Sequence, residues 1–317
     1  NDEFADYETW DDGNFYYDGA EVETLPGDYA RSGLKRGLSM HAHLGVNPFK
    51  FGLIGSTDSH TGLATADEDN FFGKFVYGEP HAHRWGPWTE TAKRAGWEWA
   101  ASGLAAVWAE ENTREAIFDA MERREVYGTT GPRIRLRFFG GWNFTPDDVD
   151  IRSFAEIGYE KGVPMGSDLP LRLHNNAPSF LVSAFKDPDS GNLDRIQVVK
   201  GWIDSNGMLS ERVYDVVWSG DRVPDDAGKL PSVGSTVDVP SATWKDTIGE
   251  PYLTALWTDP DFDVEQPAFY YARVIEIPTP RWTAYDSKRF NVEMSPEVPM
   301  VTQERAYGSP IWYTPKD

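Results

Sequence analysis

Residues 133–139 read Arg-Ile-Arg-Leu-Arg-Phe-Phe, and along this stretch apolar side chains alternate with arginines. This alternation is typical of a half-buried β-strand, whose side chains point to opposite faces in turn. Comparable short runs recur at 179–185, 194–202, 211–218, 267–276 and 310–313. Turn-forming clusters at 187–192 and 205–207 separate some of these runs. Many short strands divided by turns predict a β-sandwich over residues 133–317.

The first 132 residues have a different pattern, of mixed helix and strand. Asp28 follows a Pro-Gly pair and is predicted to cap a helix from Tyr29 to about His43, with Gly45 ending it. A second helix is predicted over residues 113–125, with Asn112 as its cap and one apolar face. The sequence therefore predicts an α+β chain with a domain boundary near residue 132.

Composition excludes several classes of site. The 317 residues include no cysteine, 51 acidic and 30 basic residues, and the net charge is −21. A chain without cysteine has no disulfide, iron–sulfur cluster, thiolate zinc site or cysteine nucleophile. The acidic net charge argues against nucleic-acid binding. The sequence contains no apolar run of about 18 residues, so it predicts no membrane span.

The opening of the chain is polar and acidic, and residue 1 is Asn. We expect either that a leader was removed or that the chain is part of a longer protein. Lack of cysteine suits oxidising and reducing compartments alike, so the compartment stays open, with a periplasmic or extracellular location favoured over a cytoplasmic one.

The apolar run 49–55, predicted to be a buried strand, is followed at once by Ser-Thr-Asp-Ser-His. Asp58 and His60 would then project from the end of a strand, where α/β proteins expose functional side chains. A carboxylate and an imidazole two residues apart can reach one divalent ion. The alternative is that Asp58 caps a turn and His60 is merely exposed.

Two His-Ala-His pairs are further candidate metal ligands. His41 and His43 lie near the end of the first predicted helix, where residues two apart point in nearly opposite directions. His81 and His83 lie in an irregular stretch, so their geometry is freer, and a surface loop is the alternative.

Other patterns carry less chemistry. Asp187, Asp189 and Asp194 resemble a calcium loop only loosely, since the glutamate at the twelfth position is missing, and a hairpin turn is the better interpretation. No phosphate-binding loop and no Gly-x-Ser-x-Gly elbow occurs. The 13 tryptophans could line a sugar-binding face, but most are expected in the core.

Longer strings resemble a known family. Residues 45–62 read Gly-Val-Asn-Pro-Phe-Lys-Phe-Gly-Leu-Ile-Gly-Ser-Thr-Asp-Ser-His-Thr-Gly. Together with the strings at 67–74, 123–133 and 309–312, this run resembles a bacterial family of uncharacterised proteins. That family belongs to the polymerase-and-histidinol-phosphatase (PHP) superfamily of metal-dependent hydrolases, and the resemblance covers nearly the whole chain.

The resemblance implies a distorted (β/α) barrel that holds divalent metal, often manganese, iron or zinc. The superfamily's late Asp-x-His motif corresponds to Asp58 and His60, which would be metal ligands, with metal-activated water attacking a phosphoester or related bond. The superfamily's first His-x-His motif lies on the opening barrel strand, and His41-Ala42-His43 does not replace it. The chain therefore resembles a C-terminal portion: the last part of the barrel over residues 1–132, then the sandwich.

Three hypotheses follow. In the first, the chain is part of a PHP-type hydrolase that acts on a small-molecule ester and needs an absent amino-terminal half. The second is a self-sufficient enzyme in which Asp58, His60, His81 and His83 converge. The third is a non-catalytic β-sandwich module that binds a polysaccharide or a protein partner. An incomplete barrel would expose strand edges, so a homo-oligomer or a covered edge is expected; general acid and base residues stay unassigned.

Overall fold

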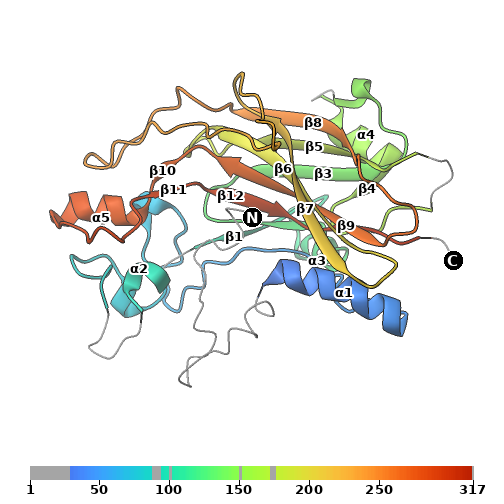
Figure 1. Ribbon diagram of the computed structural model, residues 1–317. Helices are drawn as coiled ribbons and strands as arrows, with labels where there is room; N and C mark the ends of the chain where they lie inside the picture. The colour runs from blue at the N-terminus through green and yellow to red at the C-terminus, as the bar shows by residue number, and fades with distance from the viewer. Residues whose placement is uncertain (1–28, 88–93, 100–101, 150–151, 172–175, 316–317) are drawn as a thin grey trace.

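The computed structural model describes residues 29–87, 94–99, 102–149, 152–171 and 176–315. Its strands form two main antiparallel sheets (Figure 1). The seven-stranded sheet contains, in order, β1 (Leu104–Val107), β2 (Val126–Thr129), β12 (Arg305–Gly308), β9 (Ala268–Glu276), β6 (Leu193–Ile203) and β7 (Leu209–Trp218), with β13 (Ile311–Tyr313) also paired to β9. The four-stranded sheet contains β4 (Gly162–Pro164), β3 (Arg135–Gly141), β5 (Ser179–Phe185) and β8 (Tyr252–Thr258).

The remaining elements are short and lie around these sheets. A two-stranded ribbon pairs β10 (Thr279–Pro280) with β11 (Val301–Thr302). The α-helices are α1 (Ala30–Leu44), α2 (Gly96–Trp99), α3 (Arg114–Glu122), α4 (Phe154–Lys161) and α5 (Trp282–Phe290). Single 3₁₀ turns are η2 (Glu68–Asn70), η3 (Val76–Gly78) and η4 (Pro146–Val149). None of the helices described here has the length and apolar character to cross a membrane.

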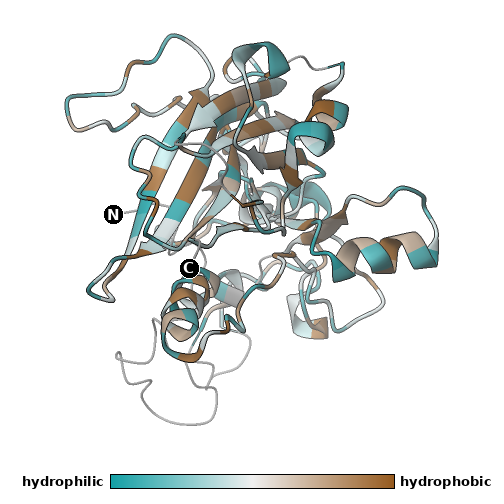
Figure 2. Ribbon diagram, turned by 90° about the vertical axis from the view of Figure 1, so that its right-hand side faces the viewer, coloured by the Kyte–Doolittle hydropathy of each residue, from teal (hydrophilic) through white to brown (hydrophobic). Residues whose placement is uncertain are grey.

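One apolar core holds the two sheets together. Phe138 of β3 and Phe180 of β5 stack at 5.4 Å between ring centres, and Tyr270 of β9 packs on Phe180 at 4.5 Å. All three belong to one buried cluster with residues of both sheets. Apolar and polar bands alternate along the strands (Figure 2), as expected when one face of each strand is buried. This arrangement is compatible with the expected β-sandwich and shows an α+β chain of mostly antiparallel sheets.

Helices cover the outer faces. Leu34 and Leu38 of α1 pack on Val199 and Phe269 of the seven-stranded sheet. Phe154 of α4 packs on the four-stranded sheet. Both faces of β6 are therefore covered, which explains why nearly all of its residues are buried.

Most of the predicted strands are confirmed. The strand β5 has the predicted bounds. The predicted runs differ by one or two residues, at one or both ends, from the other matching strands, which are β3, β6, β7, β9 and β13. The turn at 205–207 joins the paired strands β6 and β7. The prediction of a hairpin at 187–192 is wrong, since β5 and β6 belong to different sheets and this turn carries the chain from one sheet to the other.

The helix predictions are confirmed with changes at their ends. Gly45 ends α1 in the left-handed region (φ 74°), as expected, while the proposed cap Asp28 lies outside the described residues. Thr113, not Asn112, caps α3, because its hydroxyl accepts a hydrogen bond from the backbone N–H of Ala116. This helix ends at Glu122 rather than Glu125, and Arg124 follows with a positive φ of 64°.

The strand predicted over 49–55 is absent. This segment is extended but makes no ladder; the N–H of Gly55 donates to Leu104 of β1 (3.2 Å), and the N–H of Leu53 donates to Ser309 Oγ (2.9 Å). A Cβ at Gly55 would lie 2.6 Å from the carbonyl oxygen of Thr129, so only glycine permits this close crossing. An apolar run alone does not distinguish a ladder strand from a packed extended segment.

Strands from both sides of residue 132 join one sheet. The segments β1 and β2 pair antiparallel, and β2 also pairs with β12. Every strand pairing between the named strands is antiparallel. The domain boundary near residue 132 stays a prediction.

Candidate functional site

Asp58 and His60 lie on an exposed turn that follows the extended segment 49–55. The N–H of Asp58 donates to Ser56 Oγ (3.1 Å), and the N–H of His60 donates to the carbonyl of Lys74 (2.8 Å). The backbone of Asp58 has a positive φ of 49°, which is uncommon for a residue with a side chain. Such conformations persist where surrounding contacts impose them, and they cluster at functional sites.

The two side chains lie close together and remain accessible. His60 Nδ1 is 3.9 Å from Asp58 Oδ1, and the side chains are 49% and 56% exposed, respectively. Asp58 also forms an ion pair with Lys74. The ring of Phe75 packs on the imidazole with 4.4 Å between ring centres, which restricts its rotation. The turn thus presents a carboxylate and an oriented imidazole to solvent.

The hydrogen bond of His60 determines which ring nitrogen keeps a free lone pair. Nδ1 lies 2.8 Å from the carbonyl oxygen of Asp58. Because a carbonyl only accepts, Nδ1 carries the proton, and the neutral ring keeps its lone pair on Nε2. Metal-binding histidines in proteins are oriented in this way, by a carbonyl or carboxylate on the other nitrogen.

Among the other candidate histidines, His81 lacks this arrangement, while His43 shares the bond from Nδ1 to a backbone carbonyl. His81 accepts from the N–H of His83 at Nδ1 (3.2 Å), and Nε2 lies 3.3 Å from the carbonyl of Tyr77, so both ring nitrogens are engaged. His41 and His43 lie in the last turn of α1, and His43 Nδ1 bonds to the carbonyl of Ser39 (2.7 Å).

Within the described residues, no three His, Cys, Asp or Glu side chains are arranged so that they could hold a metal ion. The hypothesis of a self-sufficient enzyme requires that Asp58, His60, His81 and His83 converge. The structure does not bring these four described residues into one metal site. Asp58 and His60 are brought together as a pair.

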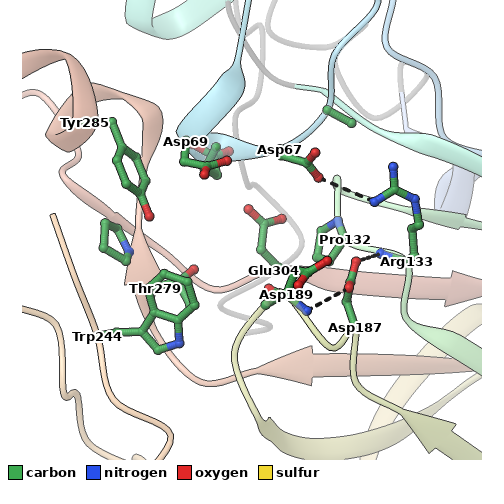
Figure 3. Close-up of a pocket in the computed structure, with 14 residues that line it drawn as sticks. Asp67, Asp69, Pro132, Arg133, Asp187, Asp189, Trp244, Thr279, Tyr285 and Glu304 are labelled. Carbon is green, nitrogen blue, oxygen red and sulfur yellow. Dashed lines mark hydrogen bonds and ion pairs between the residues drawn. The ribbon is translucent and has the colours of Figure 1, made fainter. Parts of the chain in front are cut away.

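An acidic cavity lies elsewhere, where segments distant in sequence meet. It has a volume of about 440 Å³ and lies between the segment 66–69, the turn at 187–190 and the ribbon β10. Figure 3 shows carboxylates gathered around its centre, with Trp244 and Tyr285 on one side. The lining contains six carboxylates and one guanidinium: Asp67, Glu68, Asp69, Asp187, Asp189 and Glu304, with Arg133.

Local hydrogen bonds hold these carboxylates in place. Asp187 accepts from the N–H of Arg133 (2.6 Å) and from the N–H of Asp189 (3.0 Å). Arg133 Nη1 also lies 3.9 Å from Asp67 Oδ1. Glu304 accepts from the hydroxyl of Thr130. The walls are thus built by backbone and hydroxyl donors from several segments.

The electrostatics of this cavity favour positive charge. Burial raises the pKa of Asp67; Arg133 opposes this shift, and Asp69, Asp187 and Asp189 add to it. Burial also raises the pKa of Tyr285 to about 12, and the carboxylates of Asp69 and Glu68 contribute.

Sequence reasoning missed this cavity as a site. Two sequence features could have indicated it, namely the acidic run Asp67-Glu68-Asp69 and the pair Asp187 and Asp189. Asp187 and Asp189 lie in the turn cluster predicted at 187–192, which joins two sheets and is not the predicted hairpin, and Asp194 does not line the cavity. Asp194 is instead buried and paired with Arg195 and Arg222.

Comparison with known proteins gives one result. Neither the curated proteins nor the solved structures contain a match to this chain. Residues 1–315 match the family described as "Protein of unknown function (DUF3604)". Since the match covers nearly every residue, the chain belongs to the DUF3604 family.

Proposed function

We propose that the chain is the carboxyl-terminal portion of a PHP-type metal-dependent hydrolase, in which Asp58 and His60 are two ligands of one divalent ion. The observation that carries the proposal is the orientation of His60: its Nδ1 is held by the carbonyl of Asp58, which leaves the lone pair on Nε2, and the Asp58 carboxylate lies 3.9 Å from Nδ1. The resemblance of residues 45–62 to the PHP-related family supports the same assignment. The expected architecture, a barrel portion followed by a sandwich, belongs to this proposal.

The donor set fits the expected metals in type. A carboxylate oxygen and an imidazole nitrogen are ligands for manganese, iron and zinc alike. Two donors are fewer than a protein site needs, so further ligands would come from outside the described residues. When bound, such an ion would lower the pKa of a coordinated water toward neutrality and so supply a nucleophile for a phosphoester or related bond.

The residues around the turn have separate roles in this proposal. Asp58 has a positive φ; its carbonyl accepts from His60 Nδ1, and its carboxylate lies 3.9 Å from the same nitrogen. Phe75 restricts the imidazole from one face. Lys74 neutralises Asp58 in the absence of another cation, and would compete with a metal for the same carboxylate.

The test uses the six histidines as reporters. The 317-residue chain is labelled with ¹³C-histidine, each signal is assigned by substitution, and Mn²⁺ is added in substoichiometric amounts. Paramagnetic broadening should reach His60 first, and Asp58→Asn should remove most of that preference. Asp221→Asn, at an exposed acidic residue outside both sites, is the matched control.

Two results would contradict the proposal. One is equal broadening of His60 and of the helix-end histidines His41 and His43. The other is unchanged broadening of His60 in the Asp58→Asn chain. Preferential broadening of His81 and His83 would instead indicate that this second His-Ala-His pair binds the ion.

A further inference from the structure

We propose that a small cleft on the outer face of the four-stranded sheet binds a tetrahedral oxyanion, a phosphate or sulfate group carried by a small ligand. This arginine cleft has a volume of about 180 Å³. Neither Asp58 nor His60 lines it, so the inference stands independently of the hydrolase proposal. The lining residues that carry the argument are Arg135, Arg137, Ser183, Phe185 and Trp108.

The register of the sheet brings the cleft residues together in two neighbouring rows. Arg135 of β3 pairs with Phe185 of β5, and Arg137 pairs with Ser183 on the same two strands. The alternating arginines of residues 133–139 therefore project from the face of the sheet that is turned away from the shared core. The helix α4 packs on this face farther along the strands (Figure 1), and the cleft lies beside it.

The cleft carries positive charge that its neighbours do not compensate. Arg137 Nη1 lies 3.8 Å from Glu125 Oε1, but Arg123 Nε already lies 3.0 Å from Oε2 of the same carboxylate. Within the described residues Arg135 forms no ion pair, and its guanidinium carbon lies 4.6 Å from the ring centre of Phe185. Because Arg123 balances Glu125, the charges of both cleft arginines are left over, and they match a dianion such as phosphate.

The guanidinium of Arg137 is held in a fixed position. Its carbon lies 3.4 Å from the ring centre of Trp108, and Nη1 donates to the hydroxyl of Tyr159 (2.9 Å). Its Nε and Nη2 have no hydrogen-bond partner in the part of the chain that the structure describes. A stacked guanidinium loses little further conformational freedom on binding, so these donors are preorganised for an anion.

A buried hydroxyl without a partner is the second, independent observation. Ser183 is only 4% exposed, yet its hydroxyl makes no hydrogen bond to any described residue. Val182 and Ala184 on either side of it belong to the core between the sheets, so Ser183 points the opposite way and lines the cleft. Buried polar groups without a partner are rare and indicate a missing water or ligand. Beside Arg137, a hydroxyl is a further donor to an anion.

Size and donor number favour a tetrahedral oxyanion. Sites for whole drug-sized ligands span about 300–1,000 Å³, so a cleft of about 180 Å³ holds one group of a ligand rather than all of it. The donors belong to three side chains on two strands, those of Arg135, Arg137 and Ser183. A phosphate or sulfate group offers them more oxygen atoms than a carboxylate does.

Calorimetric titration of the full chain with inorganic phosphate tests the inference. We expect saturable binding, which Arg135→Gln weakens about tenfold through loss of one charge-assisted hydrogen bond. Ser183→Ala should weaken binding about fivefold through loss of one hydroxyl donor. Thermal unfolding verifies that both variants fold, and phosphate should raise the unfolding temperature of the wild-type chain more than that of the Arg135→Gln chain.

Controls separate the competing explanations. Arg36 is exposed on α1, which packs on the other sheet, so Arg36→Gln should leave phosphate affinity unchanged. Competition distinguishes the two tetrahedral groups: sulfate that displaces phosphate indicates a site for either, and sulfate that does not displace it indicates a phosphate site. The inference is overturned if phosphate does not bind at millimolar concentration, or if acetate binds as tightly. It is equally overturned if Arg36→Gln weakens binding as much as Arg135→Gln does, or if both cleft variants leave it unchanged.

Discussion

A buried ion pair fastens the irregular segment that leads to the acidic cavity onto α5. The side chains of Arg84 and Asp286 are each 2% exposed, and Arg84 Nη2 donates to Asp286 Oδ1 (3.0 Å) while Nε donates to Oδ2. Arg84 Nη1 also donates to the carbonyls of Phe71 (2.6 Å) and Gly78 (2.9 Å). The guanidinium carbon lies 4.5 Å from the ring centre of Trp282. We predict that this contact holds residues 71–84 against α5.

The magnitude follows from the two bonds to the carboxylate. Hydrogen bonds between charged groups contribute about 1.5–3 kcal/mol each. Asp286→Asn keeps one acceptor but removes the charge, and breaking a buried pair from one side costs about 3–5 kcal/mol. We therefore expect the free energy of unfolding to fall by about 3 kcal/mol, near the lower end of that range. Asp263→Asn, at an exposed turn residue, should change it by less than about 0.5 kcal/mol.

Urea unfolding and a double-mutant cycle measure this contribution. Arg84→Met alone should be as destabilising as Asp286→Asn, and Arg84→Met with Asp286→Asn should recover about 2 kcal/mol of the summed loss, since no unpaired charge stays buried. Amide exchange over residues 71–84 should accelerate in the single variants. The reasoning is refuted if Asp286→Asn costs less than about 1 kcal/mol, or if the double variant equals the sum of the single ones.

Two further results are expected. Lys74→Gln removes the cation paired with Asp58 and should increase Mn²⁺ broadening of the His60 signal severalfold; an unchanged signal would mean that Asp58 does not bind the ion. Burial and the bond to Glu125 raise the pKa of Tyr159 from its ordinary 10.0 to about 12, so the folded chain holds this proton longer than the unfolded chain does. The free energy of unfolding should therefore fall as the pH rises from 10 to 12, and Tyr159→Phe should make that fall shallower in urea unfolding.

The strands were predictable because their pattern is local. Alternation in 133–139 and 179–185 places Leu136, Phe138, Phe180 and Val182 in one shared core. The helix ends at Gly45 and near Thr113 followed from residue type, although the capping side chain is one position later than predicted. Patterns of this kind depend on neighbours within a few residues.

The errors arise where distant contacts decide the local structure. The segment 49–55 has the composition of a buried strand, but its course depends on the approach of Gly55 to β1 and β2. The turn at 187–192 has hairpin composition, yet its flanking strands join different sheets because of their pairing with β3 and β9. Neither partner can be identified from the run itself.

The two candidate sites also differ in how far the sequence alone could predict them. Asp58 and His60 are two residues apart, so the sequence could propose them as a pair, while the bond that orients His60 appears only in three dimensions. The acidic cavity joins residues near 67, 132, 187, 244, 285 and 304. Its parts are visible in the sequence as short acidic runs, but their convergence requires the fold.

The claim that His60 presents Nε2 to a metal ion is tested most directly by ¹⁵N NMR of the histidine side chains during a Zn²⁺ titration. The account predicts that the neutral ring of His60 carries its proton on Nδ1, and that Zn²⁺ shifts the Nε2 resonance in the wild-type chain and not in the Asp58→Asn chain. A His60 ring protonated on Nε2, or an Nε2 resonance unmoved by Zn²⁺, would contradict it.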